Sequence, residues 1–272
     1  QPRFVMLVGD AHFDPRNYLG FGDLDQVPTK LVDTDYLKTA SDDWFVDFDD
    51  NGLPEMAMGR LPVHTAEEAA TVVNKIISYE DTAGSMNDAL LVADENINFD
   101  YEGGLNMIEN LLPQGMTVSK IFRGQNPTAR SDLLASLNQG QLLVDYIGHG
   151  SAEIWKGGLF SSSDALNLTN FPYLPFFVSM TCLNGYFQDL QVVSLAEALL
   201  KAEQGGAVAV WTSSGLTDPA GQVVMNATLI LLLFNGQGLT LGEITVGAKE
   251  GISDPDTRKT WILFGDPTMR IR

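Results

Sequence analysis

Two short apolar stretches, residues 142–147 (LLVDYI) and 175–180 (PFFVSM), constrain the fold of this 272-residue chain more than any other feature. Each has the length of one strand, and each runs directly into a turn of small and polar residues. Runs of this length, bounded by turn residues, are typical of strands that are buried on both faces of a parallel sheet. They therefore predict a layered α/β domain with a mainly parallel sheet.

Two reactive side chains follow these strands. His149 lies between Gly148 and Gly150 in the turn after the first strand, and Cys182, the only cysteine of the chain, follows the second. Ligands of open α/β sheets bind beyond the carboxyl ends of the strands, so we expect the imidazole and the thiol at one edge of the sheet. The flanking glycines allow a sharp bend and the close approach of another segment. A thiol beside an imidazole predicts a cysteine nucleophile.

The backbone is predicted to take part in the same chemistry. The N–H groups of Gly150 and Cys182 are candidates for stabilising an oxyanion, and the helix that begins shortly after Cys182 is expected to favour the thiolate. Each side chain also has a purely structural interpretation. A lone cysteine is often a small core residue, and a turn histidine often makes only a structural hydrogen bond. Their position at one predicted edge favours the functional interpretation.

The rest of the chain alternates strand patterns with helix patterns. Further strands are predicted at residues 4–8, 30–33, 55–58, 90–93, 117–122, 207–211, 260–264 and 268–271. Helices are predicted at about 65–80, 104–112, 127–138, 193–203, 219–234 and 241–251. The turn-rich segment 81–87 is the best candidate for a boundary. It divides the chain into an N-terminal α/β subdomain, residues 1–86, and a catalytic subdomain, residues 87–272.

Composition disfavours several classes of partner. The formal net charge of −19 argues against nucleic acid and anionic membranes. A single cysteine cannot form an internal disulfide, and the longest apolar run, residues 229–234, is far shorter than the roughly 20 residues of a membrane span. The chain starts with Gln-Pro-Arg and shows no signal-peptide pattern. We therefore expect a segment cut from a longer precursor.

The chain also resembles the gingipain family of cysteine peptidases. Residues 145–151 (DYIGHGS), followed by Trp155, resemble the histidine segment of that family, and residues 180–187 (MTCLNGYF) resemble its nucleophile segment. Four other stretches are similar to family segments and occur in the same order: 5–10 (VMLVGD), 58–62 (MGRLP), 194–199 (SLAEAL) and 261–267 (WILFGDP). The resemblance thus covers nearly the whole chain.

The resemblance implies a caspase-like three-layer sandwich in two subdomains, with Cys182 and His149 as the catalytic dyad. It also implies a secreted or cell-surface protein, made as part of a larger precursor with a pro-region and C-terminal domains, and no organic cofactor. Members of the family may orient the histidine with an acidic group from the preceding part of the same subdomain. The resemblance gives this role to Asp94, with Glu95 as the reserve.

The primary substrate pocket follows from the same resemblance. In the family, the loop after the next strand helps to wall this pocket, and here that loop comprises Trp211, Thr212, Ser213, Ser214 and Gly215. The best-known relatives cleave after Arg or Lys, which requires a buried carboxylate, but residues 221–226 (GQVVMN) contain apolar residues and no acid where an acid is expected. Asp218, Asp100 and Glu102 are the remaining acidic candidates. We therefore expect a neutral or apolar preference as readily as a basic one.

An acidic turn at residues 47–55 (DFDDNGLPE) is a candidate calcium site. Its oxygen-bearing side chains alternate, and a glycine stands at the sixth position, as in a calcium loop. The bidentate glutamate expected at position 12 is replaced by Met58. The predicted ligands are Asp47, Asp49, Asn51 and Glu55. The three histidines and the cysteine show no zinc-ligand spacing.

These observations predict a secreted cysteine endopeptidase that hydrolyses polypeptides through a thioester acyl-enzyme. Two alternatives stay open. A sortase-like transpeptidase for surface proteins would use the same dyad and pass the acyl group to an amine. A non-catalytic domain of the same fold would serve calcium-dependent binding. The presence of both Cys182 and His149 favours an enzyme.

Overall fold

A central sheet organises the molecule. The structure is a computed structural model that describes residues 2–22, 25–82, 84–235 and 238–271. Within these residues the sheet has eight strands, in the order β1-β4-β12-β11-β10-β7-β5-β6. Along that order their bounds are Phe4–Val8, Ala57–Leu61, Trp261–Phe264, Ala209–Ser213, Phe176–Met180, Leu143–Ile147, Asp88–Ala93 and Thr117–Phe122. Neighbouring strands are parallel except β11 and β12, which confirms the predicted mainly parallel sheet.

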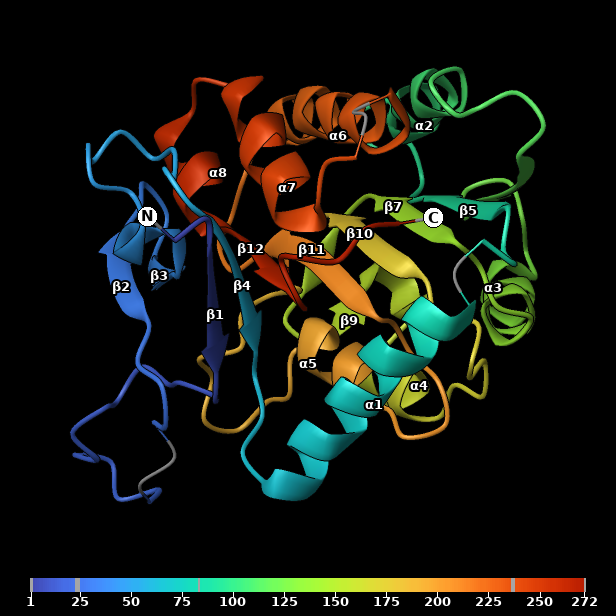
Figure 1. Ribbon diagram of the computed structural model, residues 1–272. Helices are drawn as coiled ribbons and strands as arrows, with labels where there is room; N and C mark the ends of the chain where they lie inside the picture. The colour runs from blue at the N-terminus through green and yellow to red at the C-terminus, as the bar shows by residue number, and fades with distance from the viewer. Residues whose placement is uncertain (1, 23–24, 83, 236–237, 272) are drawn as a thin grey trace.

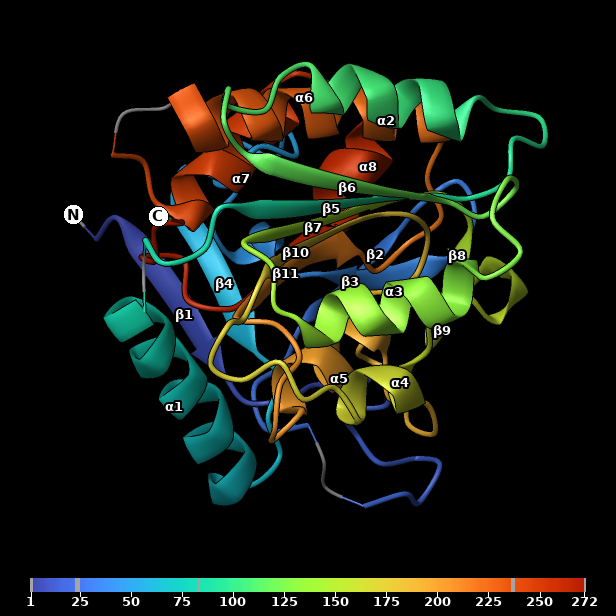
Figure 2. The same cartoon turned by 90° about the vertical axis from the view of Figure 1, so that its right-hand side faces the viewer.

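Helices cover both faces of this sheet, so the molecule has three layers (Figure 1). On one face lie α2 (Tyr101–Glu109), α6 (Pro219–Asn235), α7 (Leu241–Glu250) and α8 (Pro255–Thr260). On the other face lie α1 (Ala66–Thr82), α3 (Ala129–Asn138), α4 (Ser162–Leu166) and α5 (Leu195–Lys201) (Figure 2). The caspase-like three-layer sandwich expected from the resemblance is therefore confirmed. None of the described helices is long and apolar enough to span a membrane.

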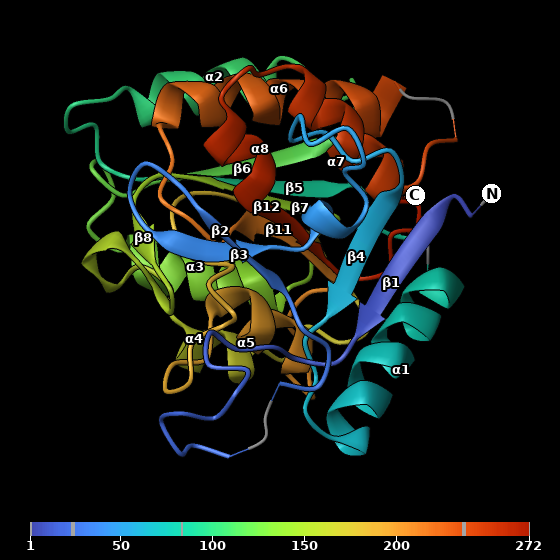
Figure 3. The ribbon, with the colours of Figure 1, turned by 90° about the vertical axis from the view of Figure 1, so that its left-hand side faces the viewer.

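Two smaller ribbons complete the fold. The antiparallel pair β2 (Lys30–Asp33) and β3 (Lys38–Ser41) forms a separate ribbon (Figure 3), and the Thr39 hydroxyl of β3 donates to the carbonyl of Ser214 at 2.6 Å. The pair β8 (Gly150–Ser151) and β9 (Ile154–Trp155) directly follows β7. Short 3₁₀ turns occupy Asp43–Phe45 and Lys156–Gly158.

The core consists of two apolar clusters, one on each face of the sheet. Although β5 reads as a continuous apolar run, its side chains alternate between the clusters, because successive strand residues point to opposite faces. Leu90 and Val92 pack on the side of α1, α3 and α5, whereas Leu91 packs on the side of α2 and α6. Burial on both faces explains why the sequence shows runs here and no polar alternation.

Several predicted elements need correction. Residues 268–271 do not form a strand, because the segment runs past the start of α7, where the carbonyls of Pro267 and Met269 accept backbone hydrogen bonds from Gly242 and Leu241. The predicted helix 104–112 begins earlier, at Tyr101, because the Asp100 side chain accepts a hydrogen bond from Gly103 N–H and caps the helix. The strand predicted at 55–58 is displaced to Ala57–Leu61.

The boundary between residues 1–86 and 87–272 stays a prediction. β1 and β4 come from the N-terminal part, and the remaining strands of the large sheet come from the rest of the chain. The two groups join through the pairing of Arg60 in β4 with Phe264 in β12. Both parts thus share one sheet.

Candidate active site

The turns that follow β7 and β10 lie at the same edge of the sheet. The two strands are parallel neighbours with Ile147 opposite Met180, so His149 and Cys182 each follow the last pair by two residues. The N–H of Gly148 also donates a hydrogen bond of 3.2 Å to the carbonyl of Met180. The strand register therefore brings the two turns together.

Asn184 ties these two turns to one another. Its amide nitrogen donates to the carbonyl of Ser151 at 2.6 Å, and its amide oxygen accepts a hydrogen bond of 2.8 Å from the indole of Trp155. A β-carbon at Gly150 would lie only 2.8 Å from the hydroxyl of Thr181, so only glycine fits at this contact. The residue just before Cys182 thus packs against the residue just after His149.

The Cys182 thiol is partly exposed and lies 3.7 Å from the carbonyl of Thr217. The next residue, Leu183, has a φ of 65°, a left-handed conformation that is unfavourable for a side chain of this kind and often occurs at functional turns. Burial raises the pKa of Cys182. Burial therefore acts against the thiolate, and the expectation that the downstream helix favours it stays a prediction.

His149 is exposed at this edge, and its backbone is held on both sides. The carbonyl accepts hydrogen bonds from the Tyr146 hydroxyl at 2.8 Å and from the N–H of Lys156 at 2.9 Å. The N–H donates to the carboxylate of Asp94 at 3.2 Å. The ring is held by a different residue, since Nε2 lies 3.0 Å from the hydroxyl of Tyr101.

Asp94, the residue expected to orient the imidazole, contacts the backbone of His149. Its side chain is fully buried, and its Oδ1 accepts hydrogen bonds from Nε of Arg123 at 2.6 Å and from the N–H of Glu95 at 2.7 Å. Glu95, the reserve candidate, forms an ion pair with Arg123 at 3.0 Å. The sequence reasoning missed Tyr101 because it placed the helix start at Gly104. The Asp100 cap was the signal that could have located the tyrosine.

The five residues expected to wall the primary pocket are buried at the end of β11: Trp211, Thr212, Ser213, Ser214 and Gly215. The hydroxyls of Thr212, Ser213 and Ser214 form hydrogen bonds within the protein. The Ser214 hydroxyl, for example, donates to the carbonyl of Ala40 at 2.6 Å. These side chains therefore do not form an open pocket in this structure. An open depression of about 510 Å³ lies further along, lined by Asp218, Ala220, Gly221, Val224, Gly251, Ile252, Ser253, Asp254 and Thr257.

The other two acidic candidates for the pocket already have partners. Asp100 caps α2 and also accepts a hydrogen bond of 2.9 Å from the Asn96 amide. Glu102 accepts a hydrogen bond from Gln125. Asp218 directly follows Thr217, whose carbonyl contacts the Cys182 sulfur, so it is the pocket-lining carboxylate closest in sequence to that contact.

The predicted calcium loop closes on its own backbone. Both carboxylate oxygens of Asp47 accept backbone hydrogen bonds, from Asn51 at 3.1 Å and from Gly52 at 2.7 Å. The Glu55 carboxylate accepts one from Phe48 at 2.6 Å. An ion would have to share these oxygens with the N–H groups. Calcium binding by Asp47, Asp49, Asn51 and Glu55 stays a prediction, which calorimetric titration with calcium would test.

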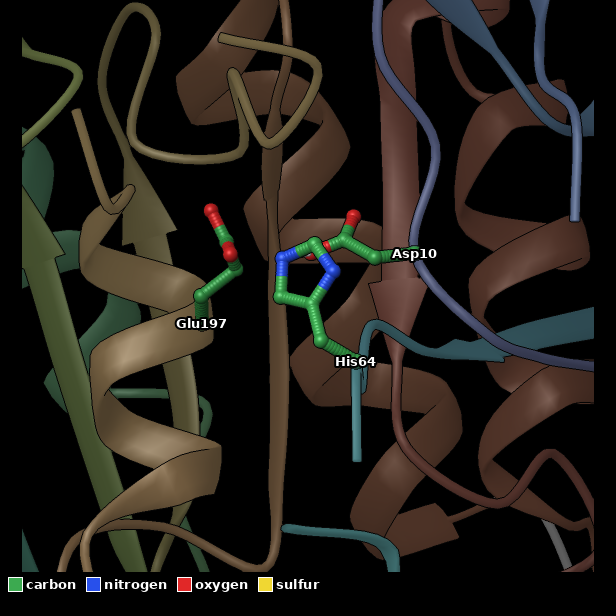
Figure 4. Close-up of side chains that lie close together, drawn as sticks. All are labelled: Asp10, His64 and Glu197. Atoms are coloured by element: carbon green, nitrogen blue, oxygen red, sulfur yellow. Dashed lines mark ion pairs between the residues drawn. The ribbon is translucent and has the colours of Figure 1, made fainter. Parts of the chain in front are cut away.

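A different group of potential metal ligands lies near the N-terminal edge. Figure 4 shows Asp10, His64 and Glu197 directed toward one another, with one ligand atom of each within 4.8 Å of the others. The Nε2 of His64 lies 2.9 Å from Asp10, and this hydrogen bond raises the pKa of the imidazole. Burial, together with the charge of Asp10, raises the pKa of Glu197 to about 7.

The ammonium of Lys201 already occupies this group. It lies 3.0 Å from Glu197 and 3.5 Å from Asp10, so it supplies the positive charge that the two carboxylates need. We therefore interpret the group as an ion-pair network that joins α5 to the segment after β1. Its members come from three distant segments, which is why sequence spacing did not predict it.

Comparison with known proteins agrees with this fold. The model of peptidase family C25 matches residues 1–272. The chain belongs to peptidase family C25. Gingipain R2 of Porphyromonas gingivalis is 28% identical to it over 99% of this chain, but the chain spans only 38% of that relative.

Solved structures of gingipains also resemble this C25 chain. The crystal structure of gingipain R (RgpB), described as an Arg-specific cysteine proteinase, superposes with a TM-score of 0.83 at 24% identity. It covers 99% of the C25 chain, which corresponds to 64% of that structure. A complex of the pro- and mature domains of P. gingivalis RgpB matches with a TM-score of 0.82 at 25% identity, again over 99% of this chain and 65% of that one. The C25 chain thus has the gingipain fold.

Proposed function

We propose that this C25 chain is a cysteine endopeptidase in which Cys182 and His149 form the catalytic dyad. One observation carries the proposal: the two residues follow parallel neighbouring strands with Ile147 opposite Met180, and Asn184 links their turns. A partly exposed thiol at this edge is accessible to a polypeptide. The family match independently supports a cysteine peptidase.

The reaction begins with transfer of the Cys182 proton to His149. The sulfur then attacks the scissile carbonyl carbon, and the electron pair of the C=O bond moves to the oxygen. The N–H groups of Gly150 and Cys182 are the proposed donors to this oxyanion. Collapse of the intermediate breaks the C–N bond, and His149 returns its proton to the leaving amine. Water, deprotonated by His149, then hydrolyses the thioester and releases the free thiol.

Burial of the sulfur gives this mechanism a pH dependence. Because burial raises the pKa of Cys182, the resting residue is a thiol near neutral pH, and attack requires removal of its proton. The fraction of reactive thiolate rises with pH up to that raised pKa. We therefore expect the rate of alkylation of Cys182 to increase from neutral to alkaline pH.

The decisive experiment combines peptide cleavage with labelling of the single cysteine. Purified chain is assayed on a mixed peptide library, beside Cys182→Ala, His149→Ala and the distant exposed control Asp33→Asn. We expect at least a 1,000-fold loss of activity in each dyad variant and none in the control. Because the chain has one cysteine, the intact mass reports labelling by a thiol-directed peptide electrophile without ambiguity.

Two results would contradict the proposal. Cleavage that persists in Cys182→Ala would exclude the sulfur as the nucleophile. Labelling at an equal rate in wild type and His149→Ala would exclude the imidazole as its base. If an added amine is incorporated into the products in preference to water, the chain is a transpeptidase. If no peptide is cleaved, the alternative of a non-catalytic binding domain is favoured.

The cleavage preference is proposed to be broader than that of the Arg-specific relative. Asp218 lines the open depression and directly follows Thr217, whose carbonyl contacts the Cys182 sulfur. Apolar side chains such as Val224 and Ile252 line the same depression. We expect Asp218→Asn to lower cleavage after basic residues while leaving cleavage after apolar residues unchanged. The same peptide library measures both.

We also propose that the natural protein is secreted and acts on extracellular polypeptides. The resemblance to the gingipains and the charge of −19 support this location. The relative solved as a complex of pro- and mature domains suggests that a pro-region also pairs with this chain. Immunoblotting of the culture medium and cell fractions would test the location, and the mass of the earliest product would test for a pro-region.

A further inference from the structure

Tyr101 is placed to control the ring of His149. It is the first residue of α2 and only 2% exposed, and its ring packs against Phe99 with the centroids 5.1 Å apart. It meets the His149 ring edge-on, with 5.4 Å between centroids and an angle of 71°. Its hydroxyl lies 3.0 Å from Nε2 of His149. This buried hydroxyl therefore has a fixed position next to an otherwise exposed imidazole.

The contact decides which ring nitrogen can serve the thiol. An imidazole has two nitrogens, and Nε2 is engaged by Tyr101. Nδ1 is then the ring nitrogen that Tyr101 leaves free. A His149 ring that was free to rotate would alternate between the two nitrogens and lose this selectivity.

We propose that Tyr101 is the positioning residue of the dyad, whose hydroxyl holds Nε2 of His149 and so directs Nδ1 toward the sulfur of Cys182. This inference rests on the proposed function of the dyad. It differs from the assignment of that role to Asp94, whose carboxylate contacts the backbone N–H of His149. Asp94 fixes the main chain, and Tyr101 fixes the ring.

The Tyr101 hydroxyl can bind Nε2 both in the neutral imidazole and in the imidazolium. In the tautomer with its hydrogen on Nε2, His149 donates that hydrogen to the tyrosine oxygen, and the bond persists when Nδ1 accepts the thiol proton. Burial, with the charges of Asp94, Cys182 and Asp218, raises the pKa of Tyr101 to about 12, so the hydroxyl stays neutral. A neutral acceptor stabilises the imidazolium less than a carboxylate would.

The test compares two substitutions that each remove one hydroxyl from His149. Tyr101→Phe removes the contact with the ring, whereas Tyr146→Phe removes the hydrogen bond to the His149 carbonyl and leaves the ring contact intact. Both variants keep the aromatic ring and its packing. Any difference between them therefore reports on the imidazole and not on general damage to the turn.

Nitrogen-15 NMR gives the most direct measurement, because the chain has only three histidines. In wild type and Tyr146→Phe, we expect the neutral ring of His149 to carry its hydrogen on Nε2. In Tyr101→Phe, we expect a mixture of the two tautomers at His149, with the signals of His12 and His64 unchanged. Equal spectra for His149 in all three proteins would overturn the inference.

Kinetics provide the second measurement. We expect Tyr101→Phe to lower kcat about 10-fold, the effect of one hydrogen bond, with KM unchanged. The acid limb of the kcat/KM profile should move to lower pH, because the imidazolium loses the acceptor of its Nε2 hydrogen. Wild-type kcat and an unmoved profile in this variant would refute the positioning role. Failure of the dyad itself gives a different result, since wild type would then neither cleave peptides nor show alkylation that depends on His149.

Discussion

Asp145 is an acidic side chain in an apolar setting, four residues before His149. It is completely buried in β7 on the side of α6, and the amide nitrogen of Asn226 lies 3.0 and 2.9 Å from its two oxygens. Burial raises the pKa of Asp145 to about 7, and the bond from Asn226 only partly opposes this. The strand that carries the histidine thus contains a group that changes its charge near neutral pH.

Replacing Asp145 by asparagine should stabilise the protein at neutral pH. The pKa of Asp145 rises from 3.8 to about 7 on folding, so the folded state favours the protonated carboxyl. The stability that this protonated group provides is fully present below pH 4 and is lost as the pH rises toward 7. Asp145→Asn removes this loss, and at pH 7 we expect a gain of roughly 2–4 kcal/mol in the free energy of unfolding. Urea denaturation at pH 5 and pH 8 measures it.

A matched control uses an exposed carboxylate. Asp33→Asn, in β2, should leave the pH dependence of unfolding unchanged. If wild type and Asp145→Asn lose stability in parallel between pH 5 and pH 8, Asp145 does not titrate in this range. The charged form would then be accommodated at the site without cost.

At the scale of the elements, a buried lysine fixes α5, the helix that follows the turn of Cys182. Lys75 of α1 is 2% exposed, and its ammonium donates to the carbonyls of Leu199, Leu200 and Ala202 at 2.9, 2.8 and 3.3 Å. The last carbonyls of a helix have no partner within the helix. Lys75 thus satisfies the carboxyl end of α5 and attaches it to α1.

Lys75→Met should therefore destabilise the protein. The substitution keeps a long apolar chain but removes the ammonium donor from the carbonyls of Leu200 and Ala202, and we expect a loss of about 1–3 kcal/mol in the free energy of unfolding. Chemical denaturation measures the loss, and Asn74→Ala on the exposed side of α1 is the control. Equal midpoints for Lys75→Met and wild type would mean that water replaces the ammonium at these carbonyls.

The elements were predictable from sequence where local patterns are strong. The runs before His149 and Cys182 became β7 and β10, and the strand at residues 117–122 has the predicted bounds. Where tertiary contacts decide, prediction failed. Residues 268–271 have an apolar alternation but bind the start of α7, and Tyr101 was overlooked because its role depends on a contact with a residue 48 positions away.

The site followed the same division. The strand register that brings His149 and Cys182 to one edge could be inferred from sequence, because parallel strands align their carboxyl ends. The sequence did not reveal which group contacts the imidazole. Asp94 and Tyr101 both lie near the turn, and only the structure shows that Asp94 contacts the backbone of His149 and Tyr101 contacts its ring.

For the whole molecule, one buried arginine links the N-terminal part to the rest of the chain. Arg60 is fully buried, and it donates to Asp42 at 2.6 and 2.8 Å and to the carbonyl of Gly9 at 2.7 Å. Its guanidinium also lies 4.9 Å from the ring centroid of Phe187, which follows the nucleophile turn. Its backbone pairs with Phe264 at the junction of the sheet. The N-terminal part is therefore integrated with the part that carries the site.

We accordingly expect the whole chain to unfold in one cooperative transition. Arg60→Met leaves the carboxylate of Asp42 buried and unpaired and should lower the free energy of unfolding by about 3–5 kcal/mol. Differential scanning calorimetry measures both effects, with the exposed Arg16→Met as the control. Two separate transitions in wild type would indicate that residues 1–86 fold independently of the rest.

The bridge that Asn184 makes between the two turns has a consequence for the proposed dyad. Because the bridge forms when the chain folds, the conformational entropy lost in bringing the turns of Cys182 and His149 together is lost on folding and not on peptide binding. The two turns are therefore held together before any peptide binds. Amide hydrogens in both turns should consequently exchange with solvent at similar, slow rates, with or without a bound inhibitor.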